Sequence, residues 1–126
     1  MLENIALIQI KNLRLRTFIG IKQEEIMNKQ DVVLNISIQY LYAGADMNES
    51  ILDALNYRTI AKKIIHFVEN KRFSLLEKMT HEVLNLISDH QEVVHATVEI
   101  DKPHALRFAD SVSLQVSYQK PGYQDV

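Results

Sequence analysis

Cysteine is absent from this chain of 126 residues, tryptophan is absent as well, and glycine and proline are scarce. Without cysteine the protein has no disulfide, no thiolate metal site and no thiol nucleophile, which fits a reducing compartment. Three glycines and two prolines leave few interruptions, so we expect few and long secondary-structure elements. The chain also lacks the glycine-rich phosphate loops and the GxSxG motif that mark nucleotide-binding and hydrolase sites.

Strong net charge and long apolar runs are missing too. Fourteen lysines and arginines against sixteen aspartates and glutamates give a net charge of -2, which excludes the broadly basic surface of a protein that binds nucleic acid or anionic lipid. No apolar run approaches the roughly 20 residues of a membrane-spanning helix, and the first residues lack the basic start of a signal peptide. We therefore expect a cytoplasmic protein with no membrane or nucleic-acid partner.

The composition that is present is that of a folded protein. Hydrophobic residues make up 47% of the chain and charged residues 24%, and this length supports one core, so we expect a single domain over residues 1–126. The five histidines show no HExxH or comparable spacing, so we expect no metal site.

Two stretches near the start alternate between apolar and polar residues, which is the pattern of strands with one buried face. They cover residues 4–19, which Gly20 ends, and residues 32–42. Residues 21–29 would connect them as the polar loop of a hairpin.

The period then changes to that of helices. Apolar residues recur at helical spacing over residues 56–71, with Asn56 as a candidate N-cap. After a short loop, Ser74 and Glu77 form a capping-box pattern that predicts a second helix to about residue 90.

Alternation returns at residues 96–100, breaks at Lys102 and Pro103, and resumes at residues 112–118. This pattern predicts a second hairpin with a long polar connection. The order is ββααββ, which predicts an α+β fold in which two helices cover one face of a four-stranded antiparallel sheet.

An open sheet of four long strands leaves two unpaired edges of backbone donors and acceptors. Edge-to-edge pairing of identical chains around a rotation axis would close the sheet and predicts a ring-shaped homo-oligomer. A monomer whose edges are protected by lysine and arginine side chains fits the same pattern.

Three residues at the ends of predicted elements are candidates for chemistry. Lys102 would be held at a strand end by Pro103, where partial desolvation would let its ammonium act as an acid or base, although a solvated lysine is the simpler alternative. Glu77 either ties back to its helix start or binds a ligand with two adjacent donors, such as the amino-pyrimidinone edge of a pterin or guanine. Tyr57 either packs or moves a proton through its hydroxyl.

Four separated blocks of the sequence resemble one known family. They are residues 13–20, 54–59, 73–78 and 98–107, which read LRLRTFIG, ALNYRT, FSLLEK and VEIDKPHALR. In this order, within residues 5–117, they are similar to the dihydroneopterin aldolase family and more narrowly to its branch of dihydroneopterin triphosphate 2'-epimerases.

The resemblance implies the tunnelling fold, in which ββααββ subunits join their sheets into a barrel of four and two such rings stack as a homo-octamer. It implies that Lys102 is the acid/base, that Tyr57 reaches the site from a neighbouring subunit, and that Glu25 is a further catalytic residue. Glu77 would bind the pyrimidine edge of the pterin. The other pterin-binding residues that the resemblance implies are Leu55, Asn56 and Leu76. Many aldolases carry histidine where this chain has Asn56, a departure that bears on aldolase activity rather than on the fold.

The activity that the resemblance implies is a cofactor-free inversion of C2' in 7,8-dihydroneopterin triphosphate, by retro-aldol cleavage and re-addition. The same intermediate would allow an aldolase that releases 6-hydroxymethyl-7,8-dihydropterin and glycolaldehyde. A third possibility is a non-catalytic ring protein that binds pterins or acts as a scaffold. For the triphosphate we expect His104 and Arg107 as cations, ahead of Lys71 and Arg72, with packing or a pair to Asp110 as the alternative for Arg107.

Overall fold

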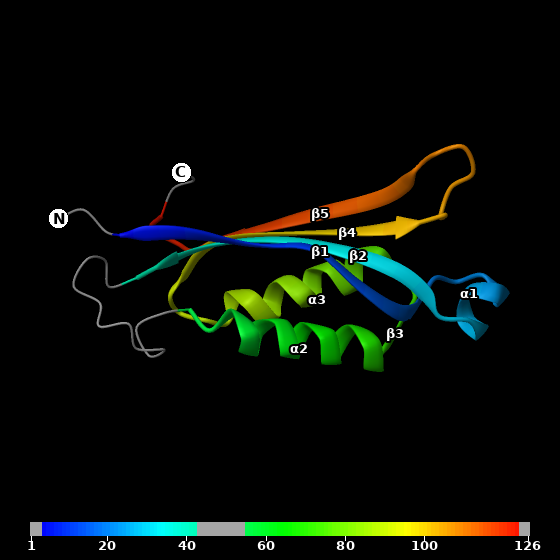
Figure 1. Ribbon diagram of the computed structural model, residues 1–126, viewed down its shortest axis with the longest axis horizontal. Coiled ribbons are helices and arrows are strands. Elements are labelled where there is room, and N and C mark those ends of the chain that lie inside the picture. The colour runs from blue at the N-terminus through cyan, green and yellow to red at the C-terminus, as the bar shows by residue number, and fades with distance from the viewer. Residues whose placement is uncertain (1–3, 43–54, 124–126) are drawn as a thin grey trace.

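The computed structural model describes residues 4–42 and 55–123, where one curved sheet is covered on one face by two long helices (Figure 1). The sheet has five strands in the order β3-β1-β2-β4-β5. The strands are β1 (Ile5–Ile19), β2 (Gln30–Leu41), β3 (Arg72–Phe73), β4 (Val93–Pro103) and β5 (Ser111–Gln119). The helices are α1 (Gln23–Met27), α2 (Tyr57–Asn70) and α3 (Leu76–Ser88).

Alternation along the strands decides which side chains enter the core. On β2, the side chains of Val32, Leu34, Ile36 and Ile38 are at most 1% exposed, and the residues between them point to the opposite face. β2 pairs antiparallel with both β1 and β4, so the buried face continues onto both neighbours. The four long strands predicted from the sequence are thereby confirmed.

Each long helix buries one stripe against this face. Asn56 caps α2 as predicted, because its Oδ1 accepts a hydrogen bond from the backbone N of Thr59 at 3.1 Å. Ile60, Ile64 and Val68 of α2 are fully buried at four-residue spacing. The buried residues of α3 are Met79, Thr80, Val83, Leu84 and Ile87.

The sequence does not predict two short elements. The connection between β1 and β2 contains α1, whose five residues include none that is buried and are too few to show a helical period. The loop between the long helices contains β3, which pairs in parallel with β1 at Phe18 and Ile19. The sheet is therefore mixed rather than purely antiparallel, and it has one strand more than predicted.

The capping box predicted at Ser74 is wrong. The N-cap of α3 is Leu75, and no side-chain hydrogen bond caps this helix. Glu77 therefore stands at the second helical position rather than at the third, where a capping-box carboxylate reaches back to the N-cap. Its carboxylate is not tied to the helix start.

β4 also continues through the predicted break. Lys102 pairs with Val112 and Pro103 with Ser111 on β5, whereas pairing with β2 ends at Asp101. Pro103 has no N–H to donate to a neighbouring strand. It is tolerated because it is the last residue of β4, at a position where β2 no longer pairs with the strand. Lys102 thus lies at a strand end, as predicted, but inside the ladder with β5.

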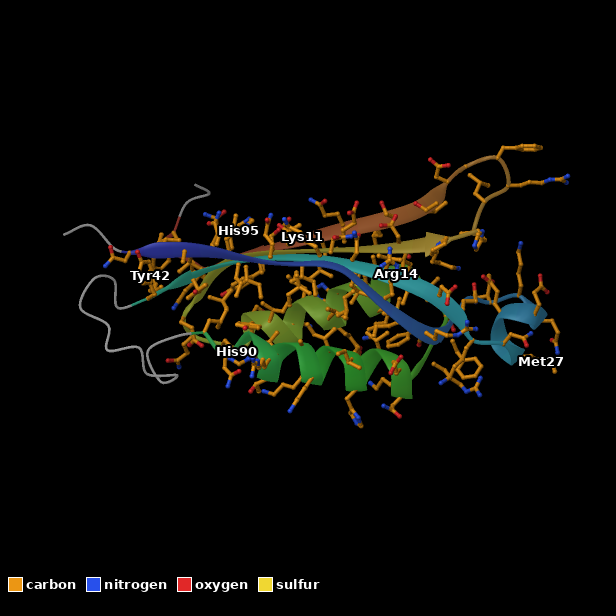
Figure 2. All side chains as sticks on the ribbon, in the orientation of Figure 1. Lys11, Arg14, Met27, Tyr42, His90 and His95 are labelled. Carbon is orange, nitrogen blue, oxygen red and sulfur yellow. The ribbon has the colours of Figure 1, made fainter. Side chains whose placement is uncertain are left out.

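The face of the sheet away from the helices is polar, and Lys11 and His95 project from it (Figure 2). Within the described residues, β5 and most of β1 have a neighbouring strand on one side only. The two open edges that the sequence predicts are therefore present in the isolated chain. No helix in the described ranges combines the length and apolarity that a bilayer crossing requires.

Candidate active site

An ion pair joins the end of β4 to the connection between β1 and β2. The Nζ of Lys102 donates a hydrogen bond to the Oε2 of Glu25 at 3.0 Å, between residues 77 positions apart in sequence. The two side chains are only 15% and 19% exposed, so water competes for them less than at an open surface. The structure thus brings together two of the three residues predicted to be catalytic.

The backbone around Glu25 holds its carboxylate in position. The Oε1 of Glu25 accepts a hydrogen bond from the backbone N of Lys22 at 3.2 Å. The carboxylate also lies against Gly20, whose φ is +133°, and any Cβ at that position would collide with it. The backbone conformation therefore favours glycine here, and a side chain at this position would displace the carboxylate of Glu25.

The ion pair changes the acidity of Glu25. The hydrogen bond from Lys102 is the main reason why the pKa of Glu25 lies below its ordinary value of 4.5, while desolvation by burial opposes this shift in part. At neutral pH the side chain of Glu25 is consequently an ionised acceptor. The pair can bind a hydroxyl or a water molecule and exchange a proton with it.

Glu25 also lines two cavities. The smaller, of about 180 Å³, is bounded by Phe18 of β1 and by Arg72 and Phe73 of β3. The larger, of about 350 Å³, is polar and includes Lys22 and His104. Glu25 therefore lies where a bound molecule could contact the β1–β3 corner of the sheet, whereas Lys102 lines neither of these two cavities and is reached through its hydrogen bond to Glu25.

The start of α3 follows this corner directly. Phe73 and Ser74 line the smaller cavity, and Leu76 and Glu77 form the first turn of α3 immediately after them. Glu77 is exposed, and within the described residues its carboxylate has no hydrogen bond or ion pair. It can therefore accept two hydrogen bonds from a ligand without first breaking a contact of its own.

The start of α2, which is the end away from β3, carries the remaining predicted site residues. They are Leu55, Asn56 and Tyr57. This helix has 14 residues, or about 21 Å at 1.5 Å per residue, and it leads from Tyr57 to β3. Figure 1 shows the start of α2 and the position of α1 at opposite ends of the molecule. Tyr57, which is 46% exposed, is therefore not brought to Lys102 and Glu25 of its own chain.

The loop after β4 carries the two predicted phosphate-binding residues. His104 and Arg107 are both exposed, and the guanidinium of Arg107 lies 5.2 Å from the ring centroid of Phe108. In the described part of the chain Arg107 makes no ion pair with Asp110, although the two stand in the same loop. Lys71, one of the less favoured cations, is paired with Glu82 at 3.8 Å.

Sequence reasoning missed two contributors to this site. Gly20 was expected only to end a strand, yet it makes the space for Glu25. Arg72 contacts α1, an element that the sequence does not predict.

Across the described residues, no group of three or more histidine, aspartate or glutamate side chains is arranged to hold a metal ion.

Comparison with known proteins finds close relatives. A family model for dihydroneopterin aldolase matches residues 8–117. The chain is 59% identical over 120 residues to the dihydroneopterin triphosphate 2'-epimerase of Escherichia coli K12, covering 95% of this chain and 100% of that protein. It is 58% identical over 113 residues to the protein of the same name from Pseudomonas aeruginosa, covering 90% and 92%.

A solved structure matches the fold. The crystal structure of Escherichia coli dihydroneopterin aldolase in complex with neopterin superposes with a TM-score of 0.83, covering 90% of this chain and 98% of that chain at 26% identity. The predicted α+β tunnelling fold is therefore confirmed.

Gly20 allows a test of how the carboxylate of Glu25 is seated. We expect Gly20→Ala to lower the free energy of unfolding by more than the about 1–3 kcal/mol that positive-φ strain alone costs, because the new methyl also displaces the carboxylate of Glu25. Gly122→Ala is the matched control, since φ there is +89° but the methyl meets nothing within 4 Å. Urea unfolding measures the free energy of unfolding of both variants. Equal losses in the two would contradict the view that the carboxylate of Glu25 occupies the space beside Gly20.

The pKa of Glu25 predicts a pH dependence of stability. Because that pKa is lowered in the folded chain, ionised Glu25 stabilises the fold above its ordinary pKa of 4.5, and this contribution is lost as the pH falls through the folded value. We expect the difference in unfolding free energy between the unmodified chain and Glu25→Gln to be constant from pH 6 to 8 and to shrink below about pH 4.5. Urea unfolding across this range measures it, and a difference that is the same at low and neutral pH would contradict the ion pair.

Proposed function

The chain belongs to the dihydroneopterin aldolase family, and from this premise we propose that it is a dihydroneopterin triphosphate 2'-epimerase. It converts 7,8-dihydroneopterin triphosphate into dihydromonapterin triphosphate by inverting C2'. The observation that carries this conclusion is the contrast in sequence identity, 59% over the whole length of the Escherichia coli K12 epimerase against 28% over 105 residues with the dihydroneopterin aldolase of the same strain. We further propose that it acts in the cytoplasm, in keeping with a chain that has no cysteine.

The reaction needs proton transfer and an electron sink, and the substrate supplies the sink. Removing the proton of the C2' hydroxyl lets the C1'–C2' bond break, with its electron pair passing into the imine of the dihydropterin ring. An aldehyde and an electron-rich ring fragment result. When the aldehyde turns and C1' attacks its other face, the same bond forms again, the oxygen regains a proton, and C2' is inverted.

The Lys102–Glu25 pair is our candidate for the proton transfer at C2'. Its support is the 3.0 Å hydrogen bond between the two side chains and their low exposure. A substrate hydroxyl or a bridging water that enters this hydrogen bond would meet a donor and an ionised acceptor together, which is what an acid/base step requires. Lys102, as the neutral amine, accepts the proton of the C2' hydroxyl, directly or through the water. Glu25 stabilises the resulting ammonium, which returns the proton to the oxygen when the C1'–C2' bond forms again.

Glu77 and Leu76 are our candidates for fixing the pterin ring. The carboxylate of Glu77 is exposed at the first turn of α3 and makes no hydrogen bond within the described residues. It can accept two parallel hydrogen bonds from the amino group and ring N–H of the pyrimidinone edge. This contact orients the ring so that C2' meets the Lys102–Glu25 pair.

Tyr57 would complete the site from a second copy of the chain, with Leu55 and Asn56 beside it. Its separation from Glu25 by the length of α2, together with the open edges of β1 and β5, supports a site built between subunits. We propose that these edges pair to form a ring of four subunits and that two rings stack as an octamer. In this assembly the hydroxyl of Tyr57 handles the proton at C1'.

Retention of the aldehyde separates an epimerase from an aldolase, because both pass through the same intermediate. A tenfold change in this partition needs only about 1.4 kcal/mol between two barriers. His104 and Arg107, in the loop after β4, are our candidates for holding the triphosphate that the aldehyde carries. Aldolase cleavage to 6-hydroxymethyl-7,8-dihydropterin is the second candidate activity, favoured by the family model itself.

Product analysis tests the proposed function. We expect incubation with 7,8-dihydroneopterin triphosphate to give product with inverted C2', resolved by chiral chromatography, and Lys102→Ala to lower kcat by about 10²–10⁴-fold because it removes the acid/base group. Lys62→Ala, which changes an exposed lysine on α2, is the control and should keep full activity. Recovery of 6-hydroxymethyl-7,8-dihydropterin as the main product would make the chain an aldolase, and unchanged substrate would exclude both activities.

A second prediction concerns Glu77. We expect Glu77→Ala to weaken neopterin binding by about 10- to 100-fold, because hydrogen bonds to a charged group contribute about 1.5–3 kcal/mol, and to leave the melting temperature unchanged. Glu82→Ala removes a carboxylate of the same helix that pairs with Lys78 at 2.8 Å, and it should leave neopterin binding intact. Calorimetric titration measures both variants. A loss of stability without a loss of binding would give Glu77 a purely structural role.

A further inference from the structure

The helix that carries Glu25 has little to hold it in place. α1 has five residues, none of them buried, and a helix of this length does not persist without tertiary contacts. Two of its hydrogen bonds, from Asn28 to Glu24 and from Gln23 to Met27, stay within the segment. Its orientation must therefore come from contacts with the rest of the chain.

Two side chains from distant parts of the chain supply such contacts. Lys102 binds the carboxylate of Glu25. Arg72 of β3 binds the residue that follows Glu25, because its Nη1 donates a hydrogen bond to the backbone O of Ile26 at 2.9 Å. That carbonyl belongs to the last turn of α1, where backbone acceptors have no partner inside the helix.

Contacts of its backbone and of its side chain with Phe18 hold Arg72 in place. Its backbone pairs with Phe18 in the parallel ladder between β1 and β3, and its guanidinium carbon lies 3.7 Å from the centroid of the Phe18 ring. A planar guanidinium can stack on a ring and donate in its own plane at the same time, which an ammonium cannot do. Arg72 and Glu25 also line the same cavity of about 180 Å³.

We propose that Arg72 is a positioning residue for the reaction, which clamps α1 between β3 and the end of β4 so that Glu25 stays aligned on Lys102. The proposal rests on the proposed function only for its kinetic consequence. A displacement of 1 Å in a catalytic group is enough to slow a reaction, and α1 has no buried side chain that could correct it. Arg72 acts through Glu25 and does not itself transfer a proton.

The test compares Arg72→Lys and Arg72→Met with Lys71→Met as the matched control. Lys71 is the neighbouring exposed cation, and it packs on Phe67 and pairs with Glu82 without a hydrogen bond to α1. We expect both Arg72 variants to lower kcat about tenfold, to change KM less than twofold and to keep the melting temperature. Arg72→Lys should be no better than Arg72→Met, because the stack and the in-plane donor are lost together.

A readout that does not depend on activity is the titration of Glu25, followed by the NMR signal of its side-chain carboxyl carbon. Lys102 from β4 is the cation that faces this carboxylate, with Lys22, Glu24 and His104 lining the cavity beside it. We expect the pKa of Glu25 to move back toward 4.5 in both Arg72 variants and to stay unchanged in Lys71→Met.

The outcomes separate this proposal from the proposed function. An unchanged titration of Glu25 in Arg72→Met would overturn the clamp even if the enzyme is an epimerase. A rise in KM for the triphosphorylated substrate with unchanged kcat would also overturn it, since Arg72 would then bind substrate directly. A shifted titration in a chain that shows no epimerase activity would support the clamp and overturn the function.

Discussion

The site depends on one ion pair, between two segments that the antiparallel pairing of β2 with β4 brings to the same end of the sheet. Lys102 ends β4, whereas Glu25 belongs to a short exposed helix between β1 and β2, and the hydrogen bond between them is 3.0 Å long. The surrounding structure makes this contact possible by leaving space at Gly20 and by ending the β2–β4 pairing at Asp101.

The course of α2 explains why a single chain would hold only part of the site that we propose. The helix runs along the length of the sheet while it buries Ile60, Ile64 and Val68 (Figure 1), and its first residue, Tyr57, therefore lies at the end of α2 away from Glu25. No side-chain movement spans about 21 Å. A site that uses both ends therefore needs a second copy, and the open strand edges provide the surface through which copies could join.

The sequence predicts the parts of this fold that follow from local periodicity, and it fails where geometry depends on distant segments. The strands and α2 follow from repeating apolar positions, and Asn56 behaves as the local N-cap that its side chain favours. The capping box at Ser74 fails because α3 begins one residue later than the pattern predicts, with Leu75 as its N-cap. Neither the approach of Lys102 to Glu25 nor the proposed clamp by Arg72 leaves a local pattern. The strand end before Pro103 made Lys102 a candidate acid or base, whereas only the resemblance to a family gave Glu25 a predicted role.

Electrostatics suggests where a triphosphate can lie relative to the proton-transfer groups. The larger cavity beside Glu25 contains two carboxylates, Glu24 and Glu25, which would repel a polyanion close to them, and it also contains Lys22 and His104. The loop after β4 begins at this cavity with His104, and further along the loop Arg107 has no carboxylate partner among the described residues. Phosphates held by that loop would retain the aldehyde. They would also stay too far from Lys102 to stabilise its ammonium, which would weaken the amine as a base. Separating the anion from the proposed acid/base pair in this way would let one site both break the C1'–C2' bond and recapture the fragment.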